Sequence, residues 1–455
     1  MNKIIINKNT VFQCAGMFLD LLKDKAVIYG ISNKIWIFIS SAVTAPLIII
    51  FFSPALQGYY YTFTGLLGIQ TLFVMGLGQL VQQFVSHEWI KIKYDPVEGL
   101  KGDEISLQRL AAIKRFTLRW FSAMSLILFI GLSLGGYIFM SNAAGPASVK
   151  LYEWLMPWLV ICFLKSFQIL LSPGLSFLEG INEVESVNRF RFSQSVSERI
   201  ASWIVMLIGG KLWLFSVGTG VNLFGQLNFF NRKFFRLLKN IFFLKATPNK
   251  IWKNEILPLQ WRYALSSLSG YLNFSFLIPL IFWFSGPVIA GQAGITWAVI
   301  TMFWGLSVTV VSTKMPELAM NFANGDFKKV NKTFYSSTIS STLLLTFSVI
   351  LFYSVLLFLM IASPGVAGRF LDPVTALIFS VSIIPHHLRF AMASYMRIMK
   401  KEPFWNISIL ESILVIIVLP FACKIYGVTG LAAGFIIIIS LMTFLTLYIF
   451  RKFKP

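Results

Sequence analysis

Charged residues are scarce in this chain. Asp, Glu, Lys and Arg together make up 13% of its 455 residues, about half the share typical of soluble domains, whereas 56% of the residues are hydrophobic. So little charge cannot cover a water-facing surface. The apolar residues come in blocks of about twenty, the length that spans a hydrocarbon core ~30 Å thick at ~1.5 Å per residue. The composition therefore predicts a membrane protein.

Cysteines are few and catalytic signatures are missing. The three cysteines, Cys14, Cys162 and Cys423, lie far apart without metal-ligand spacing, so neither a disulfide framework nor a zinc site is indicated. The sequence contains no Walker motif, GxSxG elbow, HExxH helix or paired-acid cluster. We therefore expect a protein that is not an enzyme, has no catalytic residues, and uses no cofactor or metal.

Acidic residues are also few, with 18 against 39 basic ones, which gives a net charge of +21. In a soluble protein this excess would suggest nucleic-acid binding, but here the basic residues lie almost wholly between the apolar blocks. They are expected to orient the chain and to contact anionic lipids. No basic stripe carries a nucleic-acid recognition motif, so we expect membrane lipids and no nucleic acid as partners.

The apolar blocks predict an all-α polytopic protein with about twelve transmembrane helices. Open sheet edges cannot satisfy their backbone groups in lipid, and the blocks are too long for barrel strands. Before the first block, residues 1–25 form a cytoplasmic amphipathic lead-in that is expected to lie on the membrane surface. The expected spans are 26–52, 57–86, 116–139, 154–178, 192–209, 212–231, 262–285, 288–311, 333–361, 373–395, 404–424 and 428–450.

The basic residues also predict how the chain is inserted. With the N-terminus inside, the cytoplasmic segments carry 33 of the 39 Lys and Arg residues and the outer segments carry 4. Basic residues are retained on the cytoplasmic side. Both termini, including the tail 451–455, are therefore expected in the cytoplasm.

The sequence repeats itself at an offset of 233 residues. PLIIIFFSPALQG (46–58) and PLIFWFSGPVIAG (279–291) share six of thirteen residues, among them two prolines and one glycine. Six expected spans separate the copies, so both enter the membrane from the same side, which predicts parallel repeats about an axis along the membrane normal. We therefore expect two six-helix halves, 26–231 and 262–450, around a central cavity and joined by a basic cytoplasmic linker, 232–261.

Three segments resemble a known family. SPALQGYYYTFTGLLGIQTLFVMGLGQLVQQFVSHE (53–88) resembles the first helical hairpin of polysaccharide-biosynthesis flippases of the Wzx type, in the multidrug/oligosaccharidyl-lipid/polysaccharide exporter superfamily. WRYALSSLSGYL (261–272) is similar to the start of that family's seventh span, and STKMPELAMNFANGDFKKVNKTF (312–334) looks like its cytoplasmic loop after span 8. One departure is Met75, where family members often carry an acid, which argues against a proton site there.

The resemblance implies a flippase of the bacterial inner membrane. Its cargo would be an undecaprenyl-pyrophosphate-linked oligosaccharide, moved to the outer leaflet by alternating access, as in O-antigen and lipopolysaccharide assembly. Polysaccharide polymerase and glycosyltransferases of the same pathway would be partners. Two alternatives stay open: a multidrug or small-molecule exporter of the same superfamily, which intramembrane cations disfavour, and a membrane polysaccharide polymerase or ligase, which would need a large outer loop.

Lys165 is expected near the middle of the span 154–178, too far from either end for its side chain to reach water fully. Gln168 and Ser172 follow at i+3 and i+7 and therefore share its face. These three residues are expected to line the cavity and to hold the anionic cargo. The alternative is a buried structural ion pair between Lys165 and an acid such as Glu411.

Four other polar residues fall within or near the ends of expected spans. Lys34, roughly 12 Å into the first span, is expected to contact cargo or else to snorkel to the cytoplasmic interface. Asn273 belongs to a face of small residues that suits either cargo contact or helix packing. Glu411 is expected to carry a proton for ion coupling or to pair structurally. His386 is expected either to take part in ion coupling, as a proton sensor or phosphate contact, or to mark a helix end.

Overall fold

The computed structural model describes residues 25–74, 77–143, 149–244, 268–399 and 403–453. The expected lead-in before Lys25 and the part of the expected linker from residue 245 onward lie outside these residues. Within them the chain is almost entirely helical.

The first group of elements runs from Lys25 to Phe243. Its α-helices are α2 (Lys25–Phe51), α3 (Pro54–Leu67), α4 (Gln70–Val74), α5 (Leu77–Trp89), α6 (Glu104–Ser141), α7 (Leu151–Gly180), α8 (Val184–Leu207), α9 (Trp213–Phe229) and α10 (Phe235–Phe243). A π-helical turn, η1 (Phe230–Phe234), joins α9 to α10. Such turns widen the helix by one residue and often occur where its direction changes.

A β-hairpin between α5 and α6 departs from the all-α expectation. Strands β1 (Ile92–Asp95) and β2 (Gly99–Gly102) pair antiparallel, with Ile92 opposite Gly102. The hairpin falls in a loop that the charge pattern predicts to be cytoplasmic. Water can satisfy the outer edges of a two-stranded ribbon there, whereas lipid could not.

The second group of elements begins at residue 268. A short helix, residues 268–274, leads into α12 (Leu277–Ala323), α13 (Phe327–Ala362), α14 (Pro364–Ala367), α15 (Pro373–Ile398) and α16 (Trp405–Phe453).

Two of these helices are broken by glycines with positive φ. Gly286 in α12 has φ 82° and Gly427 in α16 has φ 63°, a backbone region that residues with a Cβ avoid. Beyond its break α16 folds back on itself. A Cβ added to Gly434 would lie 3.2 Å from the side chain of Leu419, which is fifteen residues earlier in the sequence. In a straight helix these two residues would be ~22 Å apart. The breaks coincide with the expected boundaries between spans 7 and 8 and between spans 11 and 12.

Eight helical stretches in the described residues are long and apolar enough to cross a membrane. Two of them, Leu268–Ala323 and Trp405–Phe453, contain the glycine breaks. Helix α8 is absent from the eight, and its sequence contains five charged side chains after its first residue. Helix α9 is also absent and has 17 residues.

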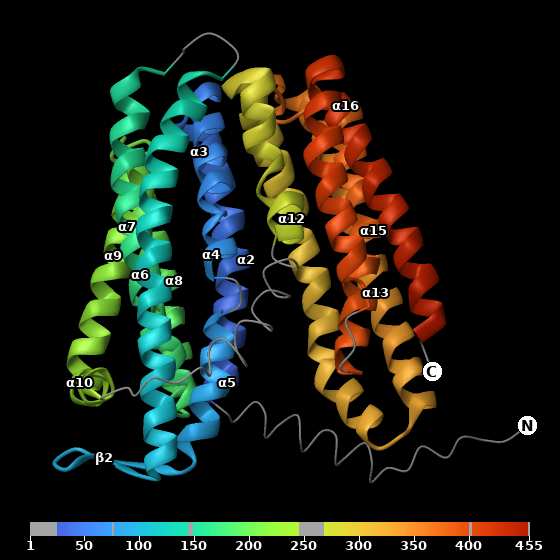
Figure 1. The fold of residues 1–455 in the computed structure, drawn as a ribbon. Coiled ribbons are helices and arrows are strands. Elements are labelled where there is room, and N and C mark those ends of the chain that lie inside the picture. The colour runs from blue at the N-terminus through green and yellow to red at the C-terminus, as the bar shows by residue number, and fades with distance from the viewer. Residues whose placement is uncertain (1–24, 75–76, 144–148, 245–267, 400–402, 454–455) are drawn as a thin grey trace, which may run out of the picture.

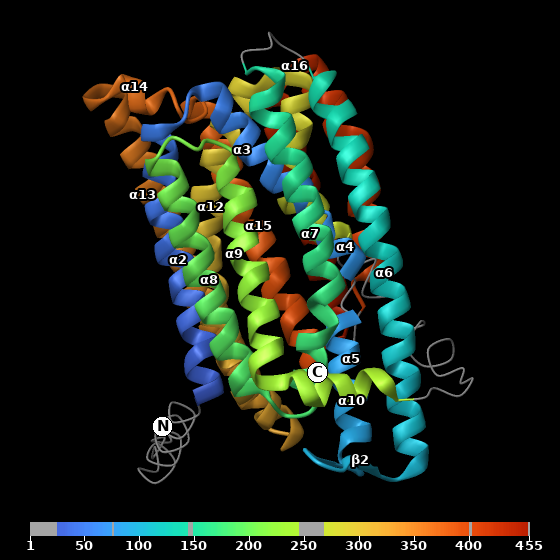
Figure 2. The ribbon, with the colours of Figure 1, turned by 90° about the vertical axis from the view of Figure 1, so that its left-hand side faces the viewer.

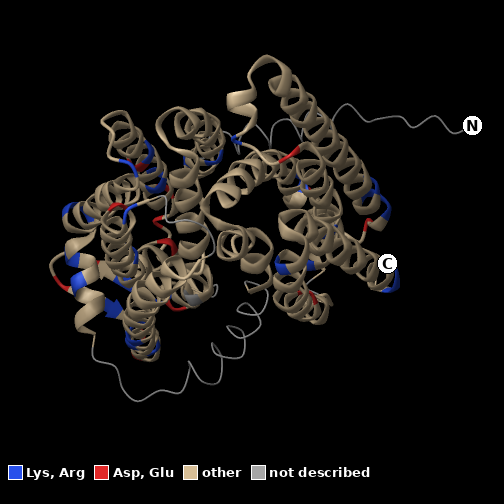
Figure 3. Cartoon of the chain, turned by 90° about the horizontal axis from the view of Figure 1, so that it is seen from above, with Lys and Arg blue, Asp and Glu red and all other residues tan. Residues whose placement is uncertain are grey.

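The two groups of helices stand side by side (Figure 1), and the view along their axes shows the same division (Figure 3). One end of the molecule, called here the hairpin end, carries β1, β2 and α10, and α10 lies across the axes of the other helices there (Figure 2). The opposite end, called the α14 end, carries α14 and the start of α3.

The two copies of the repeated segment meet between α3 and α12. A Cβ on Gly58 would lie 1.8 Å from the carbonyl oxygen of Pro287, and a Cβ on Gly291 would lie 2.8 Å from that of Pro54. Each glycine thus faces the proline of the other copy, the reciprocal pattern that a two-fold axis produces. Because both close approaches are to backbone atoms, only glycine fits at Gly58 without moving a helix.

Candidate functional site

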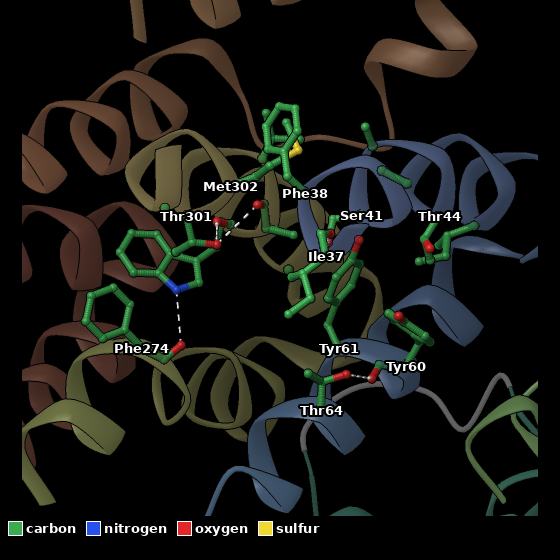
Figure 4. Close-up of a pocket in the computed structure, with 18 of the residues that line it drawn as sticks. Ile37, Phe38, Ser41, Thr44, Tyr60, Tyr61, Thr64, Phe274, Thr301 and Met302 are labelled. Carbon is green, nitrogen blue, oxygen red and sulfur yellow. Dashed lines mark hydrogen bonds between the residues drawn. The ribbon is translucent and has the colours of Figure 1, made fainter. Parts of the chain in front are cut away.

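A cavity of about 1030 Å³ lies between α2 and α3 of the first group and α12 of the second. Figure 4 shows side chains from α2, α3 and the 268–323 segment lining it. From Lys34 to Ala42 the lining residues on α2 recur at intervals of three and four, so one face of that part of the helix forms a wall. Nearer the end of α2, from Thr44 to Ile50, nearly every residue lines the cavity. The polar lining residues are Lys34, Ser41, Thr44, Tyr60, Tyr61, Thr64, Arg199, Ser275, Thr301, Thr309 and Ser312.

The charged side chains in the described lining of this cavity are all positive. Lys34 from α2 and Arg199 from α8 are its cations, and none of the described lining residues is Asp or Glu. Arg199 lies near the phenol of Tyr60 on α3, and both side chains line the cavity. In a cavity walled largely by apolar side chains, two cations without an acid among that lining favour an anionic ligand.

The rest of the wall combines aromatic rings with hydroxyls. Trp297 donates from Nε1 to the carbonyl oxygen of Phe274 at 3.1 Å, and Thr301 donates to the carbonyl of Trp297 at 2.8 Å (Figure 4). The ring of Tyr61 lies directly against Gly294, where a Cβ would come within 2.2 Å. The lining threonines donate their hydroxyl hydrogens to backbone carbonyls of their own helices, which leaves them fewer hydrogen bonds to offer a ligand. Together with the aromatic rings, this wall can contact apolar portions of a ligand.

Hydrogen bonds join the two groups of helices at the α14 end of the cavity. Arg369, which follows α14, donates from Nη2 to the carbonyl oxygens of Phe52 at 2.7 Å and Ile49 at 3.1 Å. These carbonyls end α2 and have no partner within that helix, and the negative end of its dipole favours a cation. Val366 and Phe370, on either side of Arg369, line the cavity itself.

Of the residues expected to form the site, Lys34 lines this cavity. Lys165 and Gln168 instead belong to a hydrogen-bonded chain inside the first group. Lys165 donates to Gln168 at 3.1 Å, Gln168 to Asn222 at 3.2 Å, and Asn222 to Glu198 at 2.7 Å, which links α7, α9 and α8. This series of hydrogen bonds ends at Glu198, the residue before Arg199. It therefore supports α8, the helix that carries Arg199 to the cavity.

Ser172 donates to the carbonyl of Ile169, one turn earlier on α7, at 2.9 Å. Serine hydroxyls in apolar helices are commonly satisfied in this way. The described cavity lining does not include Ser172, and its expected role in holding cargo stays a prediction.

Glu411, Asn273 and Arg389 form a buried cluster in the second group. Arg389 binds Glu411 through both of its terminal nitrogens, with Nη2 to Oε2 at 2.6 Å. Asn273 and Ser269 each donate to the same carboxylate at 3.0 Å. The acid considered as a partner for Lys165 is therefore paired with Arg389 of its own group, while a role for Glu411 in ion coupling stays a prediction.

His386 lies between this cluster and the cavity. Its ring stands edge-on to Phe274 at 4.7 Å between centroids and to Trp304 at 5.6 Å, and its Nδ1 is buried without a hydrogen-bond partner among the described atoms. Since Phe274 lines the cavity, one aromatic ring separates His386 from it. The helix α15 continues to Ile398, so His386 does not mark a helix end.

Two residues of the site were missed in the sequence. Arg199 falls within the range 192–209 expected for the fifth span. Arg369 falls between the expected spans 333–361 and 373–395. The signal for Arg199 was its position inside an expected span, whereas no local pattern marks Arg369, because its partners are more than 300 residues away in the sequence.

Comparisons with solved structures define the fold. The lipid II flippase MurJ, in an inward closed conformation, is similar with a TM-score of 0.62 over 93% of this chain and 87% of its own, at 13% identity. The MATE multidrug transporter DinF-BH is similar with a TM-score of 0.56 over 94% and 95% of the two chains, at 14% identity. An inward-facing multidrug resistance MATE family transporter of the MOP superfamily gives 0.54 over 94% of each chain, at 12% identity.

No family model matches the sequence, and no curated protein does. The structural similarity shows that this chain has the multi-pass helical fold found in transporters of the MOP superfamily. The expectation of a helical multi-pass membrane protein is confirmed.

Proposed function

We propose that this chain is a flippase that moves a lipid-linked oligosaccharide from the cytoplasmic to the outer leaflet of a bacterial inner membrane by alternating access. The observation that supports this most is the cavity between the two helix groups, with Lys34 and Arg199 but no acid in its described lining. Two cations suit the pyrophosphate of an undecaprenyl-pyrophosphate-linked unit. The aromatic and apolar wall suits the adjoining isoprenoid.

The chain crosses the membrane about twelve times, in two parallel halves of six helices. Helices α8 and α9 add two crossings to the eight long apolar stretches, and the folds at Gly286 and Gly427 divide two stretches into four. The reciprocal contact of Gly58 and Gly291 supports a two-fold relation between the halves. Three of the five charges on α8 precede the expected span 192–209. The other two do not oppose a crossing, because Arg199 lines the cavity and Glu198 is hydrogen-bonded.

The hairpin end lies in the cytoplasm. Most loops at this end are rich in Lys and Arg, as cytoplasmic loops are. With the two groups joined at the α14 end by Arg369, cargo reaches Lys34 and Arg199 from the hairpin end, where glycosyltransferases would supply it. A polymerase would take it up on the other side.

An exporter of small molecules is the second candidate, because solved MATE multidrug transporters share the fold. The cations of the cavity disfavour a cationic drug by repulsion. A strain lacking the gene separates the two functions. A flippase strain loses surface glycan and accumulates lipid-linked units facing the cytoplasm, whereas an exporter strain keeps its glycan and becomes sensitive to cationic dyes.

The cavity residues are tested in the same strain by complementation. Lys34→Gln and Arg199→Gln should each lower glycan export about tenfold or more, since a hydrogen bond to a charged group contributes ~1.5–3 kcal/mol. Lys328→Gln, at an exposed position near the start of α13, is the matched control and should export normally. Full export by both cavity variants would refute the assignment of the site.

A further inference from the structure

A second cavity of about 620 Å³ adjoins the first on the side of the hairpin end. We call it the vestibule. It is formed by the first turns of α2 and by the start of α8 with the turn before it. Its lining residues are Ala26, Val27, Gly30, Ile31, Lys34, Asn182, Val184, Glu185 and Asn188.

One face of α2 connects the vestibule to the main cavity. The vestibule residues on this helix recur at intervals of three or four and end at Lys34, which also lines the main cavity. From Lys34 the stripe continues to Ile37, Phe38 and Ser41 in the main cavity. From Ala26 to Lys34 the helix rises roughly 12 Å, enough for one or two sugar rings beside a diphosphate held at Lys34.

The two cavities differ in charge. The main cavity has two cations and no acid in its described lining, whereas the lining of the vestibule contains both the cation of Lys34 and the carboxylate of Glu185. An acid at this point would repel a second phosphate. The vestibule therefore suits a neutral, polar part of a ligand.

The remaining polar groups of the vestibule are two amides. Asn188 donates through Nδ2 to the carbonyl oxygen of Ala26 at 3.1 Å, a bond that leaves its own amide oxygen as an acceptor. Asn182 has φ 71°, a left-handed conformation that asparagine tolerates better than most residues, and its side chain is exposed. Amides and carboxylates together accept from and donate to hydroxyl groups, which sugars carry on every ring.

We infer that the vestibule binds the sugars next to the diphosphate, so that Asn182, Glu185 and Asn188 help to select the glycan. This inference rests on the proposed flippase function. Lys34, at the junction, holds the diphosphate whatever glycan follows it. The vestibule residues contribute only when sugars are present.

Binding of two ligands to the purified full chain tests the inference. The first ligand is undecaprenyl diphosphate, and the second is the lipid-linked oligosaccharide extracted from a strain that lacks the gene. The wild-type chain should bind the glycosylated ligand about fivefold or more tightly than the bare one, as expected for one or more added hydrogen bonds. Quenching of tryptophan fluorescence gives both dissociation constants.

Two kinds of vestibule variant should bring that ratio toward one while leaving affinity for the bare diphosphate unchanged. Asn182→Gly removes an amide and suits the left-handed backbone. Gly30→Leu fills the vestibule from α2, where the nearest atom to an added Cβ is Asn188 Nδ2 at 3.8 Å. Lys34→Gln should weaken both ligands alike, and Asn240→Ala on α10, outside both lining sets, should change neither.

The possible results are distinguishable. Equal wild-type affinity for the two ligands, or vestibule variants that keep the wild-type ratio, would overturn the glycan site while leaving the flippase proposal intact. A strain that accumulates no lipid-linked oligosaccharide, with a chain that binds cationic dye but not undecaprenyl diphosphate, would refute the proposed function and the glycan site together.

Discussion

Arg369 donates a hydrogen bond from Nη2 to the carbonyl oxygen of Phe52 at 2.7 Å, and these residues belong to different helix groups. A second contact reinforces the first, because Gln57 donates to the carbonyl of Arg369 at 3.1 Å and to that of Gly291 at 2.8 Å. These hydrogen bonds hold the segment after α14 against the end of α2 and the start of α3. The two groups can move apart at the α14 end only if these bonds break.

Replacing Arg369 should favour that movement. In a chain without its three native cysteines and carrying Phe370→Cys, Arg369→Gln should increase labelling by an impermeant maleimide added outside cells about tenfold. The reason is the loss of two bonds from a charged donor, worth ~1.5–3 kcal/mol each, offset in part by bonds of the glutamine. Lys150→Gln, at the residue just before α7, is the control. Unchanged labelling in Arg369→Gln would show that these bonds do not hold the α14 end closed.

The contact of Gly58 with Pro287 predicts that an alanine substitution lowers stability at this glycine but not at a glycine with free space around it. Gly58→Ala should prevent stable folding or lower the melting temperature strongly, because its Cβ would overlap the backbone of Pro287 at 1.8 Å. Gly131→Ala in α6 has no atom within 4 Å of the added Cβ. It should be neutral or stabilising by ~0.5–1 kcal/mol, as for alanine within a helix. Detergent gel filtration after heating measures both, and equal stability of the two variants would contradict the close approach.

Glu411 should be required for stability through its pair with Arg389. The side chains of the two residues are 1% and 13% exposed, so Glu411→Gln leaves a buried guanidinium uncompensated, at a cost of about 3–5 kcal/mol. The double variant Glu411→Gln with Arg389→Met should recover much of the lost thermal stability.

A different result would favour ion coupling at this site. If Glu411→Gln unfolds at the wild-type temperature but no longer responds to a proton gradient in vesicles, the carboxylate serves coupling rather than pairing. His386→Ala should then alter the same response, because His386 lies one turn before Arg389, the partner of Glu411, on α15.

Orientation can be tested at two asparagines. Asn240→Cys on α10, at the hairpin end, should be labelled by an impermeant reagent only after cells are opened. Asn142→Cys, at the end of α6, should be labelled in intact cells, because the charge bias puts that loop outside. The opposite labelling pattern would invert the proposed direction of transport.

Much of the helical plan could be predicted from local sequence, because membrane crossing depends on apolar residues summed along a short stretch. The folds at Gly286 and Gly427 fall between spans expected from hydrophobicity alone. The matching prolines of the repeat, Pro54 and Pro287, both begin a helical segment. Such features can be predicted from a residue and its neighbours in the sequence.

Which polar side chains meet the cavity was decided by tertiary structure. Lys165 and Arg199 both lie well inside helices, yet only Arg199 is in the described cavity lining, since the rotation of each helix in its bundle selects the face that it presents. Glu411 finds Arg389 on another helix, and Arg369 finds the end of α2 more than 300 residues away in the sequence. The sequence by itself therefore determined where the chain is helical and that it lies in a membrane, because those depend on hydrophobicity and backbone geometry at each position. The cavity, its charge and the hydrogen bonds at its α14 end depend on contacts between distant segments, which only the packed helices bring together.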